Sequence, residues 1–317
     1  MLATDRQQRP QDFLAANVSE DTEPCPFCRG RESETTPTIV CFSDDSADLV
    51  ASPVTCPNWQ VRVVENLYPC FVPSRESNDS ATAIGQHEVI IEAPNHLHKL
   101  TQLSDKQTEI VLRAYRHRMQ VASAKGATYG LIFKNSGQQA GMSRQHIHSQ
   151  FVGLPETPPA IRSRLARAAR FYRRHEKCLH CQLISDSLNH DQERLVANTG
   201  DFVAYCPFAS RTPYEIRIAP RSHQARFEEC SDNQINQLST LLRNLLKSLD
   251  ACLPGCAYNY IIHTLPFDTC RIDHYHWHIE IIPRVSFLAG LEWGAGILVN
   301  TVSPTTAAAH LRTVAKL

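Results

Sequence analysis

The stretch Gly141-Met-Ser-Arg-Gln-His-Ile-His-Ser-Gln-Phe-Val-Gly-Leu154 decides the fold of this chain. Within it, His146, His148 and Gln150 alternate with Ile147 and other residues in a pattern that is typical of a β-strand. Side chains two residues apart on a strand point to the same face and are separated by about 6.6 Å. We therefore expect two imidazoles and a carboxamide to stand in a row on one face of a sheet.

The segment before this strand, Asn135-Ser-Gly-Gln-Gln-Ala-Gly141, is small, polar and rich in glycine. Glycine lets backbone N–H groups come close to a phosphate, so this segment predicts a phosphate-binding loop. The alternative is that both histidines are ordinary buried residues of a half-buried strand. The remainder of the chain offers chemical partners for both of them, which favours a functional site.

Composition limits the classes of function. The chain has 317 residues, a formal net charge of zero and an ordinary globular share of hydrophobic residues, so it is long enough for about two domains. A neutral chain has no general attraction to nucleic acid. Neither a signal-peptide pattern at the start nor an apolar run of about 18 residues is present in the sequence. We expect a cytoplasmic protein with no nucleic-acid partner and no membrane partner.

Twelve cysteines are present, and four of them form two Cys-x-x-Cys pairs. Without a secretory signal, such pairs favour a reducing compartment and metal binding over a disulfide framework. The remaining eight show no ligand spacing and are interpreted as small apolar residues: Cys41, Cys56, Cys70, Cys206, Cys230, Cys252, Cys256 and Cys270.

The second half of the chain repeats the first. Cys25-Pro-Phe-Cys28 is matched by Cys178-Leu-His-Cys181, and His146-x-His148-x-Gln150 is matched by His276-x-His278-x-Glu280. Between these motifs, His96 and His223 each follow an apolar strand pattern and each precede a helix-capping serine, Ser104 or Ser231, by eight residues. The sequence therefore predicts an α+β protein of two tandem halves, each an antiparallel sheet with a packed helix, divided into residues 1–155 and 156–317.

Local patterns place the elements of each half. We expect strands at 61–64, 88–92 and 129–133 with a helix from 104 to about 124, and their repeats at 214–218 and 258–262 with a helix from 231. Residues 30–58 are rich in serine, threonine, aspartate and proline and are interpreted as a loop. Residues 155–175 are interpreted as a linker and an arginine-rich helix with a solvated surface.

Each half also offers two thiolates and two imidazoles, the set of donors that suits tetrahedral zinc. Four protein ligands close such a site, so the metal is expected to be structural. His98 and His274 are rival ligands, and the sequence leaves them open as alternatives. The predicted zinc sites are Cys25, Cys28, His96 and His146 in the first half, and Cys178, Cys181, His223 and His276 in the second.

The chain resembles the galactose-1-phosphate uridylyltransferase family, a branch of the histidine-triad superfamily, over nearly its whole length. The motifs that carry the resemblance are Arg6-x-x-Arg9-Pro, Cys25-Pro-Phe-Cys28, Phe133-Lys-Asn-Ser-Gly-x-x-Ala-Gly-x-Ser143 and His146-x-His148-x-Gln150. The resemblance implies two histidine-triad-like halves, the first catalytic and the second degenerate. It also implies a homodimer with shared active sites.

The resemblance further assigns roles to residues. It implies that His148 is the nucleophile, that His146 is a zinc ligand and that Gln150 holds the phosphoryl group. A glutamine in that position donates a hydrogen bond without being an acid or base that activates water. The residues implied to surround the nucleotide phosphates and the sugar phosphate are Arg6, Arg9, Asn135, Gly141 and Ser143, and Glu292 is implied to contact the sugar.

In the second half, the segment before His276 lacks the glycine-bearing loop, and Glu280 would repel a phosphate.

The implied chemistry is ping-pong transfer through a nucleotidyl-histidine, with a nucleotide-sugar and a sugar 1-phosphate as substrates. The leading expectation is uridylyl transfer from UDP-glucose to galactose 1-phosphate. Glu292-Trp-Gly-Ala-Gly296 and the second cysteine pair resemble a sister branch of phosphorolytic adenylyltransferases, so an ADP-sugar phosphorylase is the alternative. A non-catalytic, zinc-stabilised nucleotide-binding module is the second alternative.

Overall fold

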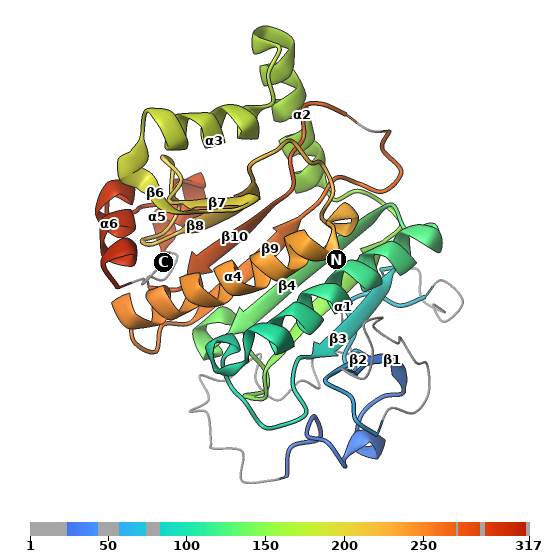
Figure 1. Cartoon of the computed structure of the whole chain (residues 1–317). Helices are drawn as coiled ribbons and strands as arrows, with labels where there is room; N and C mark the ends of the chain where they lie inside the picture. Colours follow the sequence, from blue (N-terminus) through green and yellow to red (C-terminus); the bar gives the residue numbers. More distant parts are fainter. Residues whose placement is uncertain (1–23, 44–56, 74–82, 271, 286–288, 315–317) are drawn as a thin grey trace. The chain divides into compact units, whose positions relative to one another are not determined.

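The structure is a computed structural model, and it describes residues 24–43, 57–73, 83–270, 272–285 and 289–314 (Figure 1). The chain divides into two compact units, and the described residues of each are treated separately below. The first comprises Met1–Lys134, Met142–Thr157 and Pro266–Asp268, and the second comprises Asn135–Gly141, Pro158–Leu265 and Thr269–Leu317. No helix among the described residues is long and apolar enough to span a membrane.

The first unit contains a five-stranded antiparallel sheet in the order β1-β2-β3-β5-β4. Apolar, mostly β-branched and aromatic residues form its buried face, as expected for strands with one face in a core. A long helix, α1, contacts β2 and β5. The bounds of these elements are β1 Thr38–Phe42, β2 Val61–Glu65, β3 Gln86–Ile91, α1 Asp105–Ala124, β4 Tyr129–Ser136 and β5 His148–Leu154, with short 3-10 turns at Glu32–Glu34, Leu100–Gln102 and Gln138–Ala140.

Helix α1 is fastened to the sheet by polar contacts as well as apolar ones. The Ser104 hydroxyl accepts a hydrogen bond from the Gln107 backbone N–H, which is the predicted N-cap. Further along the helix, Arg118 donates two hydrogen bonds of 2.7 Å to the buried carboxylate of Glu88 on β3. Paired, hydrogen-bonded charges of this kind hold the helix in one register against the strand.

The second unit repeats this topology with strand order β9-β10-β8-β7-β6. Figure 1 shows its long helix α4 lying across the strands, and leucines form the buried face of that helix. The Ser231 N-cap is present and forms a full capping box with Gln234. The elements are α2 Pro159–His175, α3 Leu179–Asn189, a 3-10 turn at Gln192–Arg194, β6 Leu195–Thr199, β7 Phe202–Tyr205, β8 Ile216–Pro220, a 3-10 turn at Phe227–Glu229, α4 Asp232–Cys252, β9 Tyr258–His263, β10 His278–Pro283, α5 Gly290–Ala295 and α6 Pro304–Val314.

The register of pairing is the same in both sheets. Ser149 on β5 lies opposite Ile90 on β3, and Ile279 on β10 lies opposite Ile218 on β8. One residue further along β5 and β10, Gln150 faces Val89 and Glu280 faces Arg217. The predicted α+β fold of two tandem halves is therefore confirmed, and the register makes each residue of one half comparable with one of the other.

One sequence interpretation was wrong and a second was incomplete. Residues 30–58 were interpreted as a loop, but residues 38–42 form β1, because Thr38-Ile-Val-Cys-Phe42 is a β-branched and aromatic run that pairs with β2. Cys41 was interpreted as one of the small apolar residues; it is buried, as that implies, but it is also disulfide-bonded.

Candidate functional site

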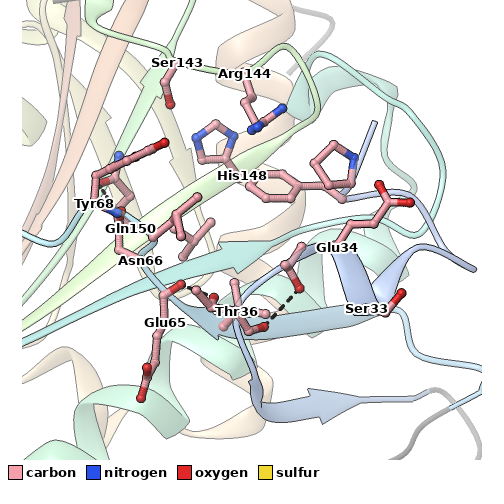
Figure 2. Close-up of a pocket in the computed structure, with 16 residues that line it drawn as sticks. Ser33, Glu34, Thr36, Glu65, Asn66, Tyr68, Ser143, Arg144, His148 and Gln150 are labelled. Atoms are coloured by element: carbon pink, nitrogen blue, oxygen red, sulfur yellow. Dashed lines mark hydrogen bonds between the residues drawn. The ribbon is translucent and has the colours of Figure 1, made fainter. Parts of the chain in front are cut away.

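A cavity of about 550 Å³ opens in the first unit, where β5 lies beside β3 and the loop before β5 (Figure 2). Polar and charged side chains form most of its wall, together with a smaller number of apolar ones. His148 and Gln150, two residues apart on β5, both line it, whereas His146, which was expected on the same strand, precedes β5 and does not line it. The lining residues are Pro26, Phe27, Ser33, Glu34, Thr35, Thr36, Val64, Glu65, Asn66, Leu67, Tyr68, Val89, Ser143, Arg144, His148 and Gln150.

The His148 ring is held in one tautomer. Its Nδ1 lies 2.8 Å from the backbone oxygen of His146. A carbonyl oxygen only accepts, so Nδ1 carries the proton and the lone pair of the neutral ring is on Nε2. Burial lowers the pKa of His148 to about 4, although the hydrogen bond to His146 opposes this shift. At neutral pH the ring is therefore an uncharged imidazole with an available nitrogen at a cavity wall.

The backbone at His148 is fixed by a buried ion pair. The Lys134 ammonium on β4 donates to the His148 carbonyl at 2.8 Å and to the Glu92 carboxylate at 2.5 Å. The Tyr115 hydroxyl of α1 donates to the other oxygen of Glu92 at 2.5 Å. All of these groups are buried, so the pairing offsets the desolvation of each charge and holds β5 rigidly behind the cavity.

A cation lies at the same cavity. Arg144, in the loop before β5, lines it together with Ser143, and Figure 2 shows both near the His148 ring. The Arg144 guanidinium stands 5.6 Å from the centroid of the Phe27 ring. Phe27 in turn meets the rings of His146 and His148 edge-on, at centroid distances of 5.9 and 5.6 Å. The arrangement places a cation and a hydroxyl where an anionic group beside the imidazole would be stabilised.

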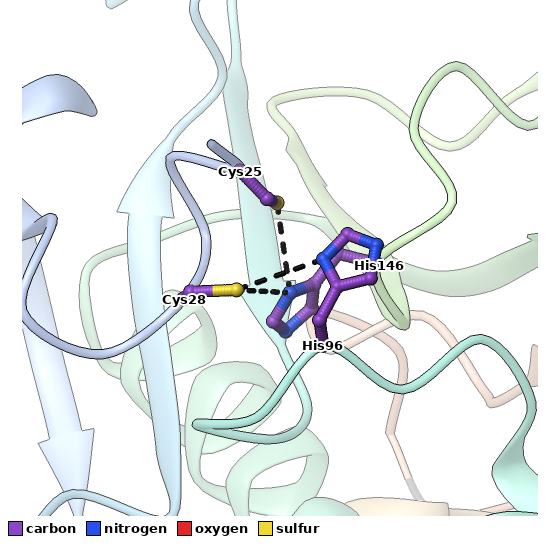
Figure 3. A group of neighbouring side chains, drawn as sticks. All are labelled: Cys25, Cys28, His96 and His146. Carbon is purple, nitrogen blue, oxygen red and sulfur yellow. Dashed lines mark hydrogen bonds between the residues drawn. The ribbon is translucent and has the colours of Figure 1, made fainter. Parts of the chain in front are cut away.

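The first predicted metal-binding set is brought together (Figure 3). The donor atoms of Cys25, Cys28, His96 and His146 all lie within 4.8 Å of one another. The His146 Nδ1 is 3.6 Å from both sulfurs, and the His96 Nδ1 is 3.6 Å from the Cys28 sulfur. In a zinc tetrahedron the edge between sulfur and nitrogen is about 3.5 Å, so the donors fit a zinc ion.

The second predicted set is also brought together, with Cys178, Cys181, His223 and His276 within 4.8 Å. The Cys181 sulfur lies 3.3 Å from His223 Nδ1 and 3.5 Å from His276 Nδ1. Hydrogen bonds from Cys181 and the two histidines lower the pKa of the Cys178 thiol, which favours the thiolate form that binds metal.

In both sets the far nitrogen of the deepest histidine meets a backbone oxygen. The His146 Nε2 is 2.9 Å from the Ala93 carbonyl, and the His276 Nε2 is 2.9 Å from the Pro220 carbonyl. Each carbonyl fixes the proton on Nε2 and leaves Nδ1 as the donor toward the sulfurs, which is the usual outer-shell arrangement of metal-binding histidines.

The rival ligands lie elsewhere. His98 packs edge-on against the His96 ring at 5.1 Å but is not part of the donor group, and His274 lies beside Tyr172. A third group, His263, His278 and Glu280, has its donor atoms within 4.8 Å. The Glu280 carboxylate of this group is bound by three arginines, which compensate its charge.

The repeat of the cavity residues in the second unit is a closed cluster of charges. Glu280 pairs with Arg217 at 3.0 Å, Arg211 at 2.9 Å and Arg164 at 3.2 Å. His263 Nε2 lies 3.1 Å from the same carboxylate. Burial raises the pKa of Glu280, but the hydrogen bonds and charges of His263 and His278 outweigh it and hold that pKa well below its usual range. Arg164 belongs to the arginine-rich helix α2, so one of its arginines has a buried partner and does not belong to a solvated surface.

Three other residues that were predicted to contact substrate, Asn135, Gly141 and Glu292, are not among the residues that line the cavity. Asn135 and Gly141 are in the second unit, where the Asn135 Oδ1 accepts from Asn259 Nδ2 at 2.8 Å and the Asn135 Nδ2 donates to the Gly141 carbonyl at 3.3 Å. Gly141 has φ +84°, which only glycine adopts without strain. Glu292 lies in α5, where its carboxylate accepts from the Ala289 N–H at 2.8 Å. Arg6 and Arg9 fall outside the described residues.

Several groups at the cavity were missed from the sequence. Asn66 and Tyr68 directly follow β2, and polar residues at a strand end were a readable signal. Arg144 lies between the glycine-bearing loop, which ends at Gly141, and His146. His87, which contacts Gln150, had no signal of its own in a single sequence.

Comparisons with known proteins give consistent results. A profile of the family described as "Domain of unknown function (DUF4921)" matches residues 80–316. The chain is 33% identical to an ADP-glucose phosphorylase of Arabidopsis thaliana over 98% of this chain and 88% of that protein. It is 27% identical to a galactose-1-phosphate uridylyltransferase of Thermotoga maritima over 72% of this chain and 74% of that protein.

Solved structures agree with the sequence relatives. A crystal structure described as an ADP-glucose phosphorylase from Arabidopsis thaliana with bound ADP-glucose superposes with a TM-score of 0.80, at 33% identity, covering 97% of this chain and 92% of that one. A structure described as uridylyltransferase gives a TM-score of 0.77 at 26% identity, covering 95% and 93%.

The fold and these relatives define a nucleotidylyltransferase, an enzyme of carbohydrate metabolism. The chain belongs to the DUF4921 family and to the group of proteins that are like galactose-1-phosphate uridylyltransferase.

Proposed function

We propose that this enzyme is an ADP-sugar phosphorylase, which transfers the adenylyl group of ADP-glucose to inorganic phosphate and yields ADP and glucose 1-phosphate. The observation that carries this proposal is the similarity to the Arabidopsis thaliana ADP-glucose phosphorylase, which extends along nearly the whole chain. Similarity to the uridylyltransferase of Thermotoga maritima is lower and covers less of both chains. The proposal therefore prefers the phosphorylase to uridylyl transfer from UDP-glucose to galactose 1-phosphate.

In the first step the lone pair of His148 Nε2 attacks the α-phosphorus of ADP-glucose. The bond from that phosphorus to the bridging oxygen breaks, and glucose 1-phosphate leaves as an anion that needs little help from a general acid. The product on the enzyme is an adenylyl-histidine. The His146 carbonyl, which accepts the Nδ1 proton, stabilises the positive charge that the ring gains.

In the second step an oxygen of inorganic phosphate attacks the same phosphorus. The bond between phosphorus and Nε2 breaks, its electron pair returns to the imidazole, and ADP leaves. The two steps balance without any further reactant. In both of them the chain stabilises charge on the phosphoryl oxygens, for which Gln150, Arg144 and Ser143 line the cavity.

Other parts of the proposal rest on the resemblance. Arg6, Arg9, Asn135 and Gly141 are proposed to contact the phosphates, and Glu292 the sugar. Residues 1–155 would form the catalytic domain and residues 156–317 a degenerate one, in a cytoplasmic homodimer.

Two structural zinc ions are also part of the proposal. The residues proposed to hold them are the two Cys/His groups whose donor distances fit zinc. Zinc, when bound, would hold His146 in place, two residues before His148, because His146 is a donor in the first group. Elemental analysis of the purified protein is expected to give about two zinc ions per chain.

The test is mass spectrometry of zinc-replete protein mixed with ADP-glucose or, separately, with UDP-glucose. We expect an AMP-sized adduct on His148 that inorganic phosphate removes, with release of ADP. His148→Asn provides the control, because asparagine leaves a polar side chain but no nucleophilic ring nitrogen.

Two other outcomes would contradict the proposal. A UMP-sized adduct that galactose 1-phosphate removes, with no AMP adduct, would identify a uridylyltransferase. No adduct from either donor, together with binding that His148→Asn leaves intact, would identify a non-catalytic nucleotide-binding module.

A further inference from the structure

The hydrogen bonds that other described residues make to the Gln150 carboxamide reach only its oxygen. Its oxygen Oε1 lies 2.8 Å from His87 Nε2 on β3 and 3.5 Å from Asn66 Nδ2 at the end of β2. The structure gives no hydrogen bond from its nitrogen to another described residue, and Gln150 lines the cavity beside His148. The orientation of this amide decides whether a phosphoryl oxygen meets an N–H donor or a carbonyl oxygen.

The tautomer of His87 settles which atom of Gln150 faces it. The backbone N–H of Cys70 points at His87 Nδ1, at 3.0 Å. A backbone N–H only donates, so Nδ1 carries the lone pair and the neutral ring carries its proton on Nε2. That proton is directed at Gln150, and the atom that receives it must be the amide oxygen.

Asn66 supports the same orientation. Its own Oδ1 accepts from the Tyr68 N–H at 2.9 Å, so its Nδ2 is turned toward Gln150. The nitrogens of Asn66 and His87 lie 3.1 Å apart because both are directed at one oxygen. With two donors on Oε1, the amide N–H groups of Gln150 are left for the cavity.

The matching position in the second unit is different. Val89 and Arg217 occupy equivalent places opposite Gln150 and Glu280, so the residue equivalent to His87 is Glu215. The Glu215 carboxylate accepts from Arg211 at 2.7 Å, in the closed charge cluster. An imidazole at this position, on the strand that precedes the zinc-set histidine, is therefore a feature of the first unit, whereas in the second unit the imidazole that contacts the third residue is His263 on β9.

We propose that His87 is a positioning residue, which turns the N–H groups of Gln150 toward the phosphoryl group during transfer to and from His148. The proposal rests on the proposed function of the same site. Without the His87 proton the amide is free to rotate, and a reversed amide would put its carbonyl oxygen against an anion. The effect belongs to the transfer step, where charge on the phosphoryl oxygens is largest.

Two variants with side chains of similar size test whether His87 orients the Gln150 amide or only fills space beside it. His87→Gln keeps an N–H donor at about the place of Nε2, whereas His87→Asn keeps only an acceptor for the Cys70 N–H. Single-turnover formation of the adenylyl-histidine at saturating ADP-glucose is expected to slow about 10- to 100-fold in His87→Asn, with little change in KM. His87→Gln is expected to stay within about 3-fold of the unmodified enzyme. Equal slowing in both variants, or none in His87→Asn, would overturn the proposal.

A double-mutant cycle tests the route through Gln150. If His87 acts by orienting that amide, adding His87→Asn to Gln150→Ala should slow adduct formation by no more than about 2-fold further. Independent, multiplicative slowing would show that His87 acts in another way. Thermal unfolding of each variant checks that lost activity does not reflect an unfolded protein.

A spectroscopic readout keeps this proposal separate from the proposed function. Nitrogen-15 NMR of the histidine rings reports which nitrogen carries the proton, whatever the substrate is. A proton on Nε2 of His87, with Nδ1 unprotonated, is expected, and a proton on Nδ1 would overturn the proposal. Failure of the unmodified enzyme to form any adduct would remove the proposed function but would leave this NMR result to stand by itself.

Discussion

The two halves carry the same three-residue motif, His-x-His-x-Gln or His-x-His-x-Glu, in the same strand register. The surroundings of its last residue, Gln150 or Glu280, differ between them. Gln150 faces Val89 across the strand pair and lines a cavity. Glu280 faces Arg217 and is enclosed by Arg164, Arg211 and His263. The strand pattern therefore determines where the second histidine and the last residue of the motif lie. The residues that surround them decide whether a ligand can reach these side chains.

The protonation of the second histidine does not separate the halves. Burial lowers the pKa of His148 to about 4 and that of His278 to about 3, so both rings are neutral. What differs is the space beside Nε2. His278 is stacked on His180 at 4.4 Å, and its Nε2 is 3.6 Å from the Glu280 carboxylate, whereas His148 stands at a cavity wall. His148, the proposed nucleophile, therefore differs from His278 more in the access of a ligand to its Nε2 than in its pKa.

Exchanging these two histidines for asparagine gives the largest expected contrast. His148→Asn should reduce adduct formation by about four orders of magnitude, because no nucleophile remains. His278→Asn should leave the rate within about 5-fold of the unmodified enzyme, with some loss of stability from the altered buried contacts. Single-turnover mass spectrometry measures both. An adduct that survives in His148→Asn and disappears in His278→Asn would reverse the assignment of the halves.

Neutralising Glu280 should give the next largest effect, on stability. Glu280→Gln leaves Arg164, Arg211 and Arg217 around an uncharged amide, and breaking a buried charge network typically costs about 3–5 kcal/mol. Urea unfolding is the measurement. Arg31→Gln serves as a control, because its ion pair with Glu34 is exposed and should cost less than about 1 kcal/mol. A change below about 1 kcal/mol in Glu280→Gln would mean that the cluster is not a stabilising one.

The reverse exchange in the first half should affect catalysis. Gln150→Glu keeps an acceptor for His87 and Asn66, so the fold should change in stability by less than about 1 kcal/mol. The new negative charge faces the phosphoryl group, and adduct formation should fall about 10²- to 10³-fold. Stopped-flow or quenched single-turnover assays measure the rate. Unchanged transfer in this variant would show that the third position does not face the phosphoryl group.

The smallest expected effect concerns the two helix caps, for which the halves should behave alike. Ser104→Ala and Ser231→Ala each remove a hydroxyl that accepts one helix N–H, which costs about 1 kcal/mol. Chemical unfolding of the two variants gives the comparison. A difference above about 1 kcal/mol between them would show that one cap is coupled to more of its half than the hydrogen bond indicates.

The sequence was sufficient for features that depend on local spacing. The alternation of His148 and Gln150 on β5 and the two serine caps were correctly placed, because each depends on a few consecutive residues. His146 was expected on the same strand, but β5 begins at His148 and His146 precedes it. The two Cys/His groups were brought together as expected from their order in the repeat. Strand β1 was hidden by the polar residues around it, although its own five residues carried a strand pattern.

Contacts between distant segments could not be predicted in this way. His87 and Gln150 are 63 positions apart and meet only because β3 pairs with β5. Arg164 and Glu280 are 116 positions apart, and an arginine on a charged helix gives no sign that it has a buried partner. The environment that separates an open site from a closed cluster is set by such contacts, so it became visible only in the folded chain.

Each Cys/His group also has a consequence for the unfolded chain. The first joins Cys28 to residues 68 and 118 positions away, and the second joins Cys181 to residues 42 and 95 positions away. A cross-link that closes a loop of about 100 residues removes enough conformational entropy from the unfolded state to stabilise the fold by about 4–5 kcal/mol in the chain-entropy account of disulfides. A metal ion bound at these residues would act as such a cross-link in a medium that reduces disulfides. The resistance of each half to unfolding would then follow the supply of metal during synthesis.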